Sequence, residues 1–263
     1  MKSRRVEDIV KEAKRLVEHG YHEIVLTGIH LGNYGIELPE KPNLAGVVKA
    51  LLEIPGLERI RLGSIESVEV SEELVDLMAN EPRFCTHLHL PLQAGSDHIL
   101  KLMNRHYNLQ EFKDLIARLR SRIPGLAITT DIIAGFPGET DEDFEETMKT
   151  VEEIGFTHIH AFPYSKREGT PAAAMEDQVP EAVKKTRVAL LNSLGQKGLQ
   201  NFAEQMIGKP AEILIEREED GYYLGFTNEY IHGKIKKGTT AHDVGTIIGG
   251  TVTAFDGETL IIE

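Results

Sequence analysis

The chain has 263 residues and a formal net charge of −13, an acidic balance that argues against general coating of nucleic acids. Hydrophobic residues make up 41% of it, which excludes a disordered protein, and the single cysteine, Cys85, excludes a disulfide framework and a cysteine-built zinc or iron–sulfur site within this chain. Because no apolar run reaches the roughly 20 residues of a membrane helix and the first residues lack the apolar stretch of a signal peptide, we expect a soluble, cytoplasmic protein with no membrane partner.

Amphipathic helices alternate with short apolar strands along the first part of the chain. Helical spacing and terminal Gly or Pro residues predict helices over residues 6–19, 44–53, 72–79, 109–122 and 141–154. Apolar runs predict strands over residues 23–27, 59–63, 86–90, 126–134 and 157–162. This alternation is typical of α/β proteins with a parallel sheet. Five strands are too few for a full barrel of about 250 residues, so we expect a partial parallel (βα) barrel that lacks its first strand.

The character of the sequence changes near residue 206. A long charged helix is predicted over residues 180–205, and only strand-like segments follow Gly208. These strands are predicted over residues 211–217, 222–226, 230–236, 245–255 and 259–262. The pattern indicates a small all-β barrel, so we expect one domain over residues 1–205 and a second over residues 206–263.

Glycine and small polar residues follow the predicted parallel strands. Ligands bind at the carboxyl ends of such strands, where a glycine lets the backbone approach them closely. The strand ends lie in residues 26–33, 63–66, 91–97, 131–139 and 162–167. Glycine at one strand end can simply terminate the strand, but glycine and small polar residues at five strand ends together favour a ligand site.

Two His-x-His pairs lie on predicted strands, His87 with His89 and His158 with His160. Side chains alternate along a strand, so each pair shares a face, as in zinc hydrolases that hold their metal on barrel strands. Histidines packed in a core or facing a cleft explain the same pattern, and Asp131 is the only acidic residue in the neighbouring strand segments. We therefore assign no metal ligand, and a zinc-dependent barrel hydrolase stays as an alternative.

Lysines and aromatic residues gather in the C-terminal module. Such a mixture suits phosphate contact and base stacking on a small barrel. Solvated lysines and core aromatics would explain it equally well. The predicted RNA-binding residues are Lys234, Lys236, Lys237, Tyr222, Tyr223 and Phe226, with Tyr230 nearby. A non-catalytic RNA-binding protein is therefore a second alternative.

Several strand ends, taken in order, resemble one enzyme family. The matching segments are residues 23–32, 91–97, 130–140, 162–170 and 221–227. They are similar to the tRNA methylthiotransferases, a radical S-adenosylmethionine family, and residues 206–263 resemble its RNA-binding TRAM domain. The stretch Thr27-Gly28-Ile29-His30-Leu31-Gly32 favours the subgroup that adds a methylthio group to C2 of N6-threonylcarbamoyladenosine beside the anticodon.

The resemblance implies a partial barrel of the radical S-adenosylmethionine type and a set of cofactor contacts. Thr27 and Gly28 would line the methionine end of S-adenosylmethionine. Gln93 and Ser96 would lie near its ribose. The contacts near its adenine would be Ile133, Gly135, Phe162 and Pro163.

One departure from the family affects the expected activity. Its members hold a 4Fe–4S cluster with a CxxxCxxC loop after the first barrel strand, and a second cluster in an N-terminal domain. Neither cysteine set is present here, and residues 2–6 resemble the segment just after the loop. We therefore expect an N-terminally truncated chain that is inactive alone and carries no catalytic residue. The full-length enzyme would use tRNA, 4Fe–4S clusters and a reducing system such as flavodoxin.

Overall fold

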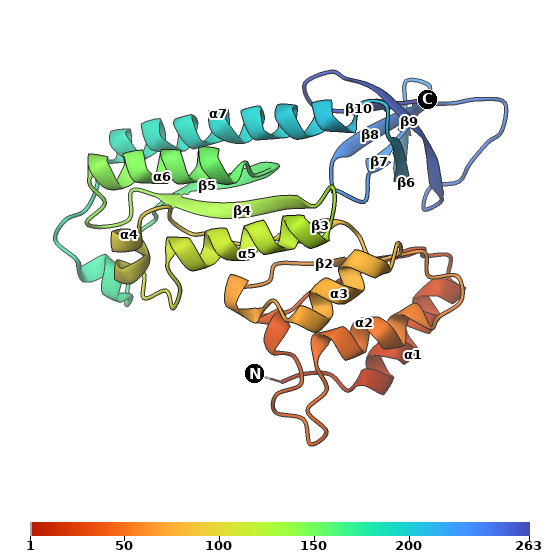
Figure 1. Ribbon diagram of the computed structural model, residues 1–263, viewed down its shortest axis with the longest axis horizontal. Helices are drawn as coiled ribbons and strands as arrows, with labels where there is room; N and C mark the ends of the chain where they lie inside the picture. The colour runs from red at the N-terminus through yellow and green to blue at the C-terminus, as the bar shows by residue number, and fades with distance from the viewer. Residues whose placement is uncertain (1) are drawn as a thin grey trace. The chain divides into compact units, whose positions relative to one another are not determined.

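The computed structural model describes residues 2–263 (Figure 1). In chain order the α-helices and strands are α1 (Val6–Glu18), β1 (Glu23–Leu26), α2 (Leu44–Leu52), β2 (Arg59–Leu62), α3 (Glu72–Asn80), β3 (His87–His89), α4 (Asp97–Leu102), α5 (Leu109–Arg122), β4 (Ala127–Ala134), α6 (Asp141–Ile154), β5 (His158–Pro163), α7 (Glu181–Met206), β6 (Pro210–Glu219), β7 (Tyr222–Phe226), β8 (His232–Lys236), β9 (Ile247–Phe255) and β10 (Leu260–Ile262). Short 3₁₀ helices occupy Leu31–Asn33, Ser67–Glu69 and Pro171–Ala174. Within residues 2–263 no helix has the length and apolar character needed to span a membrane.

The chain divides into two compact units. The first contains the residues up to Leu88, Arg122–Ala127 and Phe202–Glu263, and the second contains His89–Ser121 and Ile128–Asn201. This division differs from the predicted domains, because the C-terminal barrel groups with β1 and β2.

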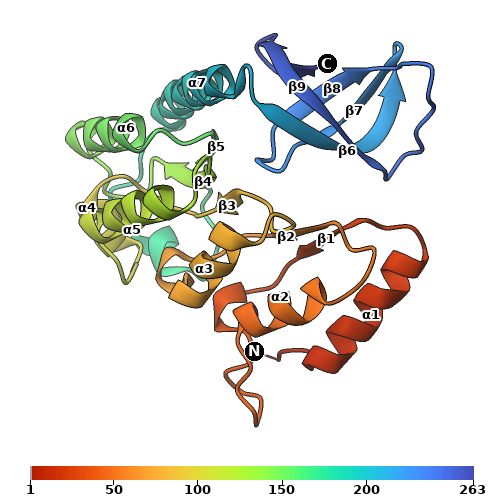
Figure 2. The same ribbon diagram turned by 45° about the vertical axis from the view of Figure 1, so that its right-hand side comes forward.

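The first unit begins with two parallel strands and three helices. β1 and β2 pair in register, from Glu23 opposite Arg59 to Leu26 opposite Leu62. Helices α1, α2 and α3 lie on one side of these strands (Figure 2). The amide of Gly46 donates to the Asn43 side chain, which caps the start of α2, as expected for an N-cap asparagine.

The five C-terminal strands of the first unit close into a barrel in the order β10-β8-β7-β6-β9. This confirms the predicted all-β module. Two fully buried arginines of β2 explain why the barrel groups with β1 and β2. Arg59 donates to the carbonyls of Glu212 and Phe226, and Arg61 donates to those of Thr227 and Asn228, at 2.9–3.1 Å.

The second unit is built on β4 and β5, and His89 at the end of β3 continues the sheet order β3-β4-β5. β4 and β5 are parallel, from Thr129 opposite His158 to Ala134 opposite Pro163, which confirms the predicted parallel α/β arrangement. Helix α7 packs closely on the Ile159 side of β5. Gly195 of this helix makes the close approach possible, because a Cβ added there would lie only 3.2 Å from the Ile159 Cβ. The other face of β5, which carries His158 and His160, is exposed.

The predicted element bounds agree with the structure to within a few residues. The predicted strand over residues 86–90 is shorter, because β3 ends at His89. The Leu90 amide still donates to Thr129, but Pro91 has no N–H with which to continue the ladder.

Candidate functional site

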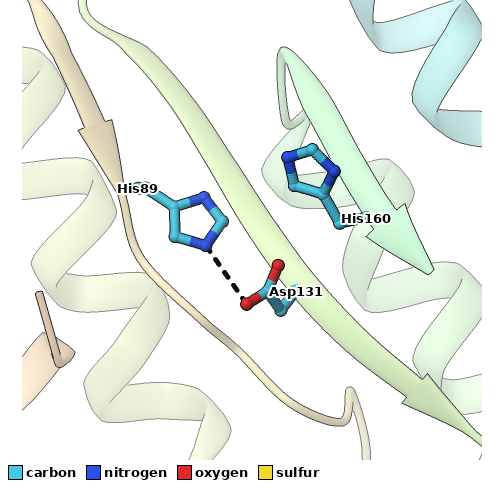
Figure 3. Close-up of side chains that lie close together, drawn as sticks. All are labelled: His89, Asp131 and His160. Carbon is cyan, nitrogen blue, oxygen red and sulfur yellow. Dashed lines mark ion pairs between the residues drawn. The ribbon is translucent and has the colours of Figure 1, made fainter. Parts of the chain in front are cut away.

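The second unit brings together three ionisable side chains, His89 at the end of β3, Asp131 on β4 and His160 on β5 (Figure 3). Asp131 on β4 lies directly opposite His160 on β5. One donor atom from each side chain lies within 4.8 Å of the others, and His89 Nε2 is 3.3 Å from an Asp131 carboxylate oxygen. The other ring nitrogen of His89, Nδ1, lies 2.9 Å from the Thr129 hydroxyl. We call this group the His–Asp–His cluster.

The surroundings of the cluster shift the pKa values of its members. Burial alone would raise the pKa of Asp131, but the hydrogen bond from His89 and the charges of His89 and His160 lower it overall. Burial and then the neighbouring His89 lower the pKa of His160. The pKa of His158 is lowered by burial and then by His160 and His89. At neutral pH the aspartate is therefore ionised and both β5 histidines are mainly neutral.

The structure does not assemble the four-histidine set of the hydrolase alternative. His87 is buried in the first unit, 5.0 Å from the Tyr230 ring. His158 packs edge-on against His160 at 4.5 Å, but among the described residues the group compact enough for one ion contains Asp131 and not His158. Sequence reasoning noted Asp131 but did not place it in a site, because only the register of β4 against β5 sets it beside His160.

Four predicted cofactor contacts lie together at the strand ends of the second unit. Ile133 pairs with Phe162, and Pro163 follows on β5. The Gln93 backbone donates to Asp131 and accepts from Ile133 at 2.8 Å, which joins it to the end of β4. Phe162 is 50% exposed, so its ring offers an apolar surface there.

Ser96 and Gly135 are corrections to the predicted site. Ser96 is fully buried, and its hydroxyl donates to Asp143 at 2.7 Å, so it is not available to a ribose. Gly135 is also covered, because a Cβ there would lie 2.4 Å from Lys184 Cγ. Its amide donates to the Glu139 carboxylate at 2.6 Å. Ser96 is thus used in a hydrogen bond between distant segments and Gly135 in one within a short loop, and the sequence pattern revealed neither.

Thr27 and Gly28 lie in the first unit, where they are exposed and follow β1. They line a pocket of about 840 Å³ whose other walls come mainly from α1 and residues 2–4 and 29–34. The lining is mostly apolar, including Ile24 and Leu26. The structure thus places the two predicted methionine-end contacts on one accessible surface.

Cys85 is the only cysteine of the chain, and its surroundings do not fit an iron–sulfur cluster. The residue is 1% exposed, and burial is the main cause that raises its pKa to about 12. A cluster requires several thiolates that reach one another. The residues of this chain therefore do not form the cluster site that the resemblance implies.

An aromatic group lies on the β7–β8 hairpin of the barrel. Phe226 stacks on Tyr230, with ring centroids 4.4 Å apart, and contacts His232 at 4.0 Å. His232 lies opposite Phe226 in the strand register, so the sequence-based prediction missed it. Tyr230 and His232 are exposed, which adds two rings to the predicted surface.

The remaining predicted RNA contacts differ in their availability. Lys236 is exposed and Tyr222 is half-buried. Lys234 forms an ion pair with Asp256 at 2.7 Å, and Lys237 pairs with Glu218 at 2.5 Å. Tyr223 is a correction, because its ring is 1% exposed in the barrel core and cannot stack on a base. Alternation along β7 turns Tyr223 inward and Tyr222 outward.

The sequence profile described as the radical SAM superfamily matches residues 1–151. Among curated proteins, the chain is 42% identical over 237 residues to threonylcarbamoyladenosine tRNA methylthiotransferase MtaB of Bacillus subtilis, covering 88% of this chain and 52% of the relative. It is 46% identical over 215 residues to a tRNA-2-methylthio-N(6)-dimethylallyladenosine synthase of Thermoanaerobacter sp., covering 82% and 46%. The chain spans about half the length of these curated relatives.

Solved structures show the same fold at low sequence identity. Coproporphyrinogen III oxidase (HemN) from Escherichia coli, a radical SAM enzyme, matches with a TM-score of 0.52 and 18% identity over 72% of this chain and 46% of that one. The radical S-adenosylmethionine methyltransferase TsrM from Kitasatospora setae matches with a TM-score of 0.51 and 18% identity over 65% and 33%. These matches confirm the fold predicted for the α/β part.

Proposed function

Because the chain belongs to the radical S-adenosylmethionine superfamily and, within it, to the tRNA methylthiotransferase family, we propose that it is part of an enzyme that modifies tRNA. The proposed reaction adds a methylthio group to C2 of N6-threonylcarbamoyladenosine beside the anticodon. The observation that carries this proposal is the 42% identity to MtaB over 88% of the chain.

Overall sequence identity supports the family, whereas the choice of nucleoside is supported by one short segment. Relatives named as dimethylallyladenosine synthases reach 42–46% identity, so overall identity does not separate the two substrates. The segment Thr27–Gly32, which resembles the threonylcarbamoyl subgroup, supports the proposed substrate. Its first two residues line the pocket of the first unit.

We assign two binding tasks to the residues of this chain. The exposed Phe162 ring and the half-buried Ile133 beside it offer an apolar surface for the adenine of S-adenosylmethionine, with Gln93 and Pro163 at its rim. On the barrel, the exposed Lys236 and the rings of Phe226 and Tyr230 offer phosphate and stacking contacts for tRNA.

Reductive cleavage of S-adenosylmethionine is not assigned to these 263 residues. That chemistry needs an iron–sulfur cluster, and a single buried cysteine does not provide one. The full-length enzyme would supply the cluster and receive electrons from a donor such as flavodoxin. We therefore propose that this chain alone binds substrates and does not turn them over.

Anticodon stem-loops test the substrate. Fluorescence anisotropy should show that the 263-residue chain binds a stem-loop with N6-threonylcarbamoyladenosine at least threefold more tightly than one with N6-dimethylallyladenosine or unmodified adenosine. The reverse preference would overturn the choice of nucleoside, and no binding to any stem-loop would overturn the RNA role. Nucleoside mass spectrometry after incubation with S-adenosylmethionine and dithionite should find no methylthio product, and finding one would contradict the inactivity of this chain.

A further inference from the structure

The His–Asp–His cluster has a donor set that the proposed function does not use. Two imidazoles and one carboxylate, each with one ligand atom within 4.8 Å of the others, come from three adjacent strands. Imidazole nitrogen favours first-row transition metals over magnesium or calcium, which prefer all-oxygen sites. This composition occurs at metal centres that keep one or more coordination positions open.

The backbone and a neighbouring hydroxyl hold the cluster in place. Asp131 and His160 are register partners in parallel strands, so the distance between their Cα atoms is fixed by the sheet. The Thr129 hydroxyl lies 2.9 Å from His89 Nδ1, which leaves Nε2 toward Asp131. A hydrogen bond of this kind to the second ring nitrogen commonly orients a histidine that ligates metal.

The distances allow an ion with small side-chain movements. Tetrahedral zinc with bonds of about 2.0–2.1 Å separates its ligand atoms by roughly 3.4 Å. His89 Nε2 and the Asp131 carboxylate already lie 3.3 Å apart. His160 is exposed, so its ring can turn toward them without disturbing the core.

The strands that carry the cluster are packed on their other face. Ile132 and Ile159 are buried there, so the backbone that positions Asp131 and His160 is held in place.

We propose that His89, Asp131 and His160 bind one divalent first-row transition metal ion, with zinc as the probe ion. The three protein ligands leave at least one coordination position open on the face of β4 and β5 that carries these side chains, which is exposed at β5. Ile133 and Phe162, the residues proposed to contact adenine, lie two positions further along the same strands, about 6.6 Å away at 3.3 Å per residue. The metal site itself does not depend on that proposed contact.

Isothermal titration calorimetry with zinc chloride on the whole chain, after treatment with a chelator, tests the proposal. We expect one zinc ion per chain with a dissociation constant in the micromolar range or tighter. Asp131→Asn and His160→Asn should each weaken binding at least tenfold. His158→Asn is the matched control, because His158 lies on the same strand face outside the cluster, and it should stay within threefold of the parent chain.

Cobalt(II) gives a second readout that does not need the variants to fold. The parent chain should develop the visible absorption of four- or five-coordinate cobalt, and one equivalent of zinc should remove it. Binding without one-to-one stoichiometry, or binding that survives Asp131→Asn and His160→Asn in folded protein, would overturn the proposal. A parent chain that binds neither ion would do so as well. Loss of stem-loop binding would not affect these results, so the two proposals fail independently.

Discussion

The Arg61 guanidinium lies 2.9 Å from the Glu23 carboxylate, and both side chains are withdrawn from solvent between β1 and β2. The other two nitrogens of Arg61 donate to the carbonyls of Thr227 and Asn228 on the barrel. Arg59 also lies 3.5 Å from this carboxylate, so the two arginines together neutralise the acid, and Arg61 satisfies two backbone acceptors besides.

Arg61→Met should lower the free energy of unfolding by about 3 kcal/mol, because it removes the closer of the two arginines that pair with Glu23 and leaves two carbonyls without these donors. Urea titration followed by circular dichroism measures the change. The control is Arg217→Met, since Arg217 and its partner Glu219 are both more than half exposed. That variant should stay within about 0.5 kcal/mol of the parent chain. A loss below about 1 kcal/mol for Arg61→Met would contradict the role of Arg61.

Asp143 links the residues after β3 to the start of α6. Its carboxylate accepts hydrogen bonds from Ser96, His98 and the Thr140 amide. Burial alone would raise the pKa of Asp143, but these hydrogen bonds hold it below its usual value of 3.8. Asp143→Asn should therefore cost about 1–3 kcal/mol of stability at neutral pH.

The stability lost through Asp143→Asn should become smaller as the pH falls. A lowered native pKa gives stability that is present above about 3.8 and is lost as the pH falls through the native value. The stability difference between parent and variant should thus be constant near neutrality and shrink in acid. Glu142→Gln, an exposed change in the same helical turn, should show a small difference at every pH. A cost for Asp143→Asn that grows toward low pH would contradict the assignment.

Cys85 should be unreactive in the native chain. It is 1% exposed and the pKa of its thiol is about 12, so almost no thiolate is present at pH 8. Titration with Ellman's reagent should show labelling at least 100-fold slower in native protein than in protein unfolded by guanidinium chloride. Rapid labelling of the folded chain would show that the residue is accessible, against the structure.

Lys236 should contribute to RNA binding more than its two neighbours. Lys234 and Lys237 are held by Asp256 and Glu218, whereas Lys236 is exposed on the same hairpin. Lys236→Ala should reduce the salt dependence of stem-loop binding by roughly 0.7 to 0.9 in log–log slope. Lys14→Ala, the same charge change on exposed α1, is the control. Equal slopes for Lys236→Ala and Lys14→Ala would remove Lys236 from the RNA surface.

Phe226 tests the stacking part of the same surface. Phe226→Leu keeps an apolar side chain beside Tyr230 but removes the aromatic face. The free energy of stem-loop binding should therefore become less favourable by about 1–3 kcal/mol. The thermal unfolding midpoint, measured in parallel, shows whether the barrel is intact. Unchanged affinity in a folded variant would assign Phe226 to packing alone.

The order of helices and strands, the parallel α/β class and the closing five-stranded barrel could all be predicted from the amino-acid sequence. These features follow from local signals: the spacing of apolar residues, the caps of helices and the turns that end strands. The same signals placed Gln93, Ile133 and Phe162 at strand ends, where the structure has them.

Which side chains contact one another and which are buried became known from the folded structure. Asp131 joins His89 and His160 through a strand register that no local pattern encodes, since pairing distant segments depends on the whole fold. Ser96 and Tyr223 are of residue types that often contact ligands, yet packing against distant segments buries both side chains. The barrel joins β2 rather than standing apart, because the buried guanidinium groups of Arg59 and Arg61 must find acceptors and the barrel carbonyls provide them.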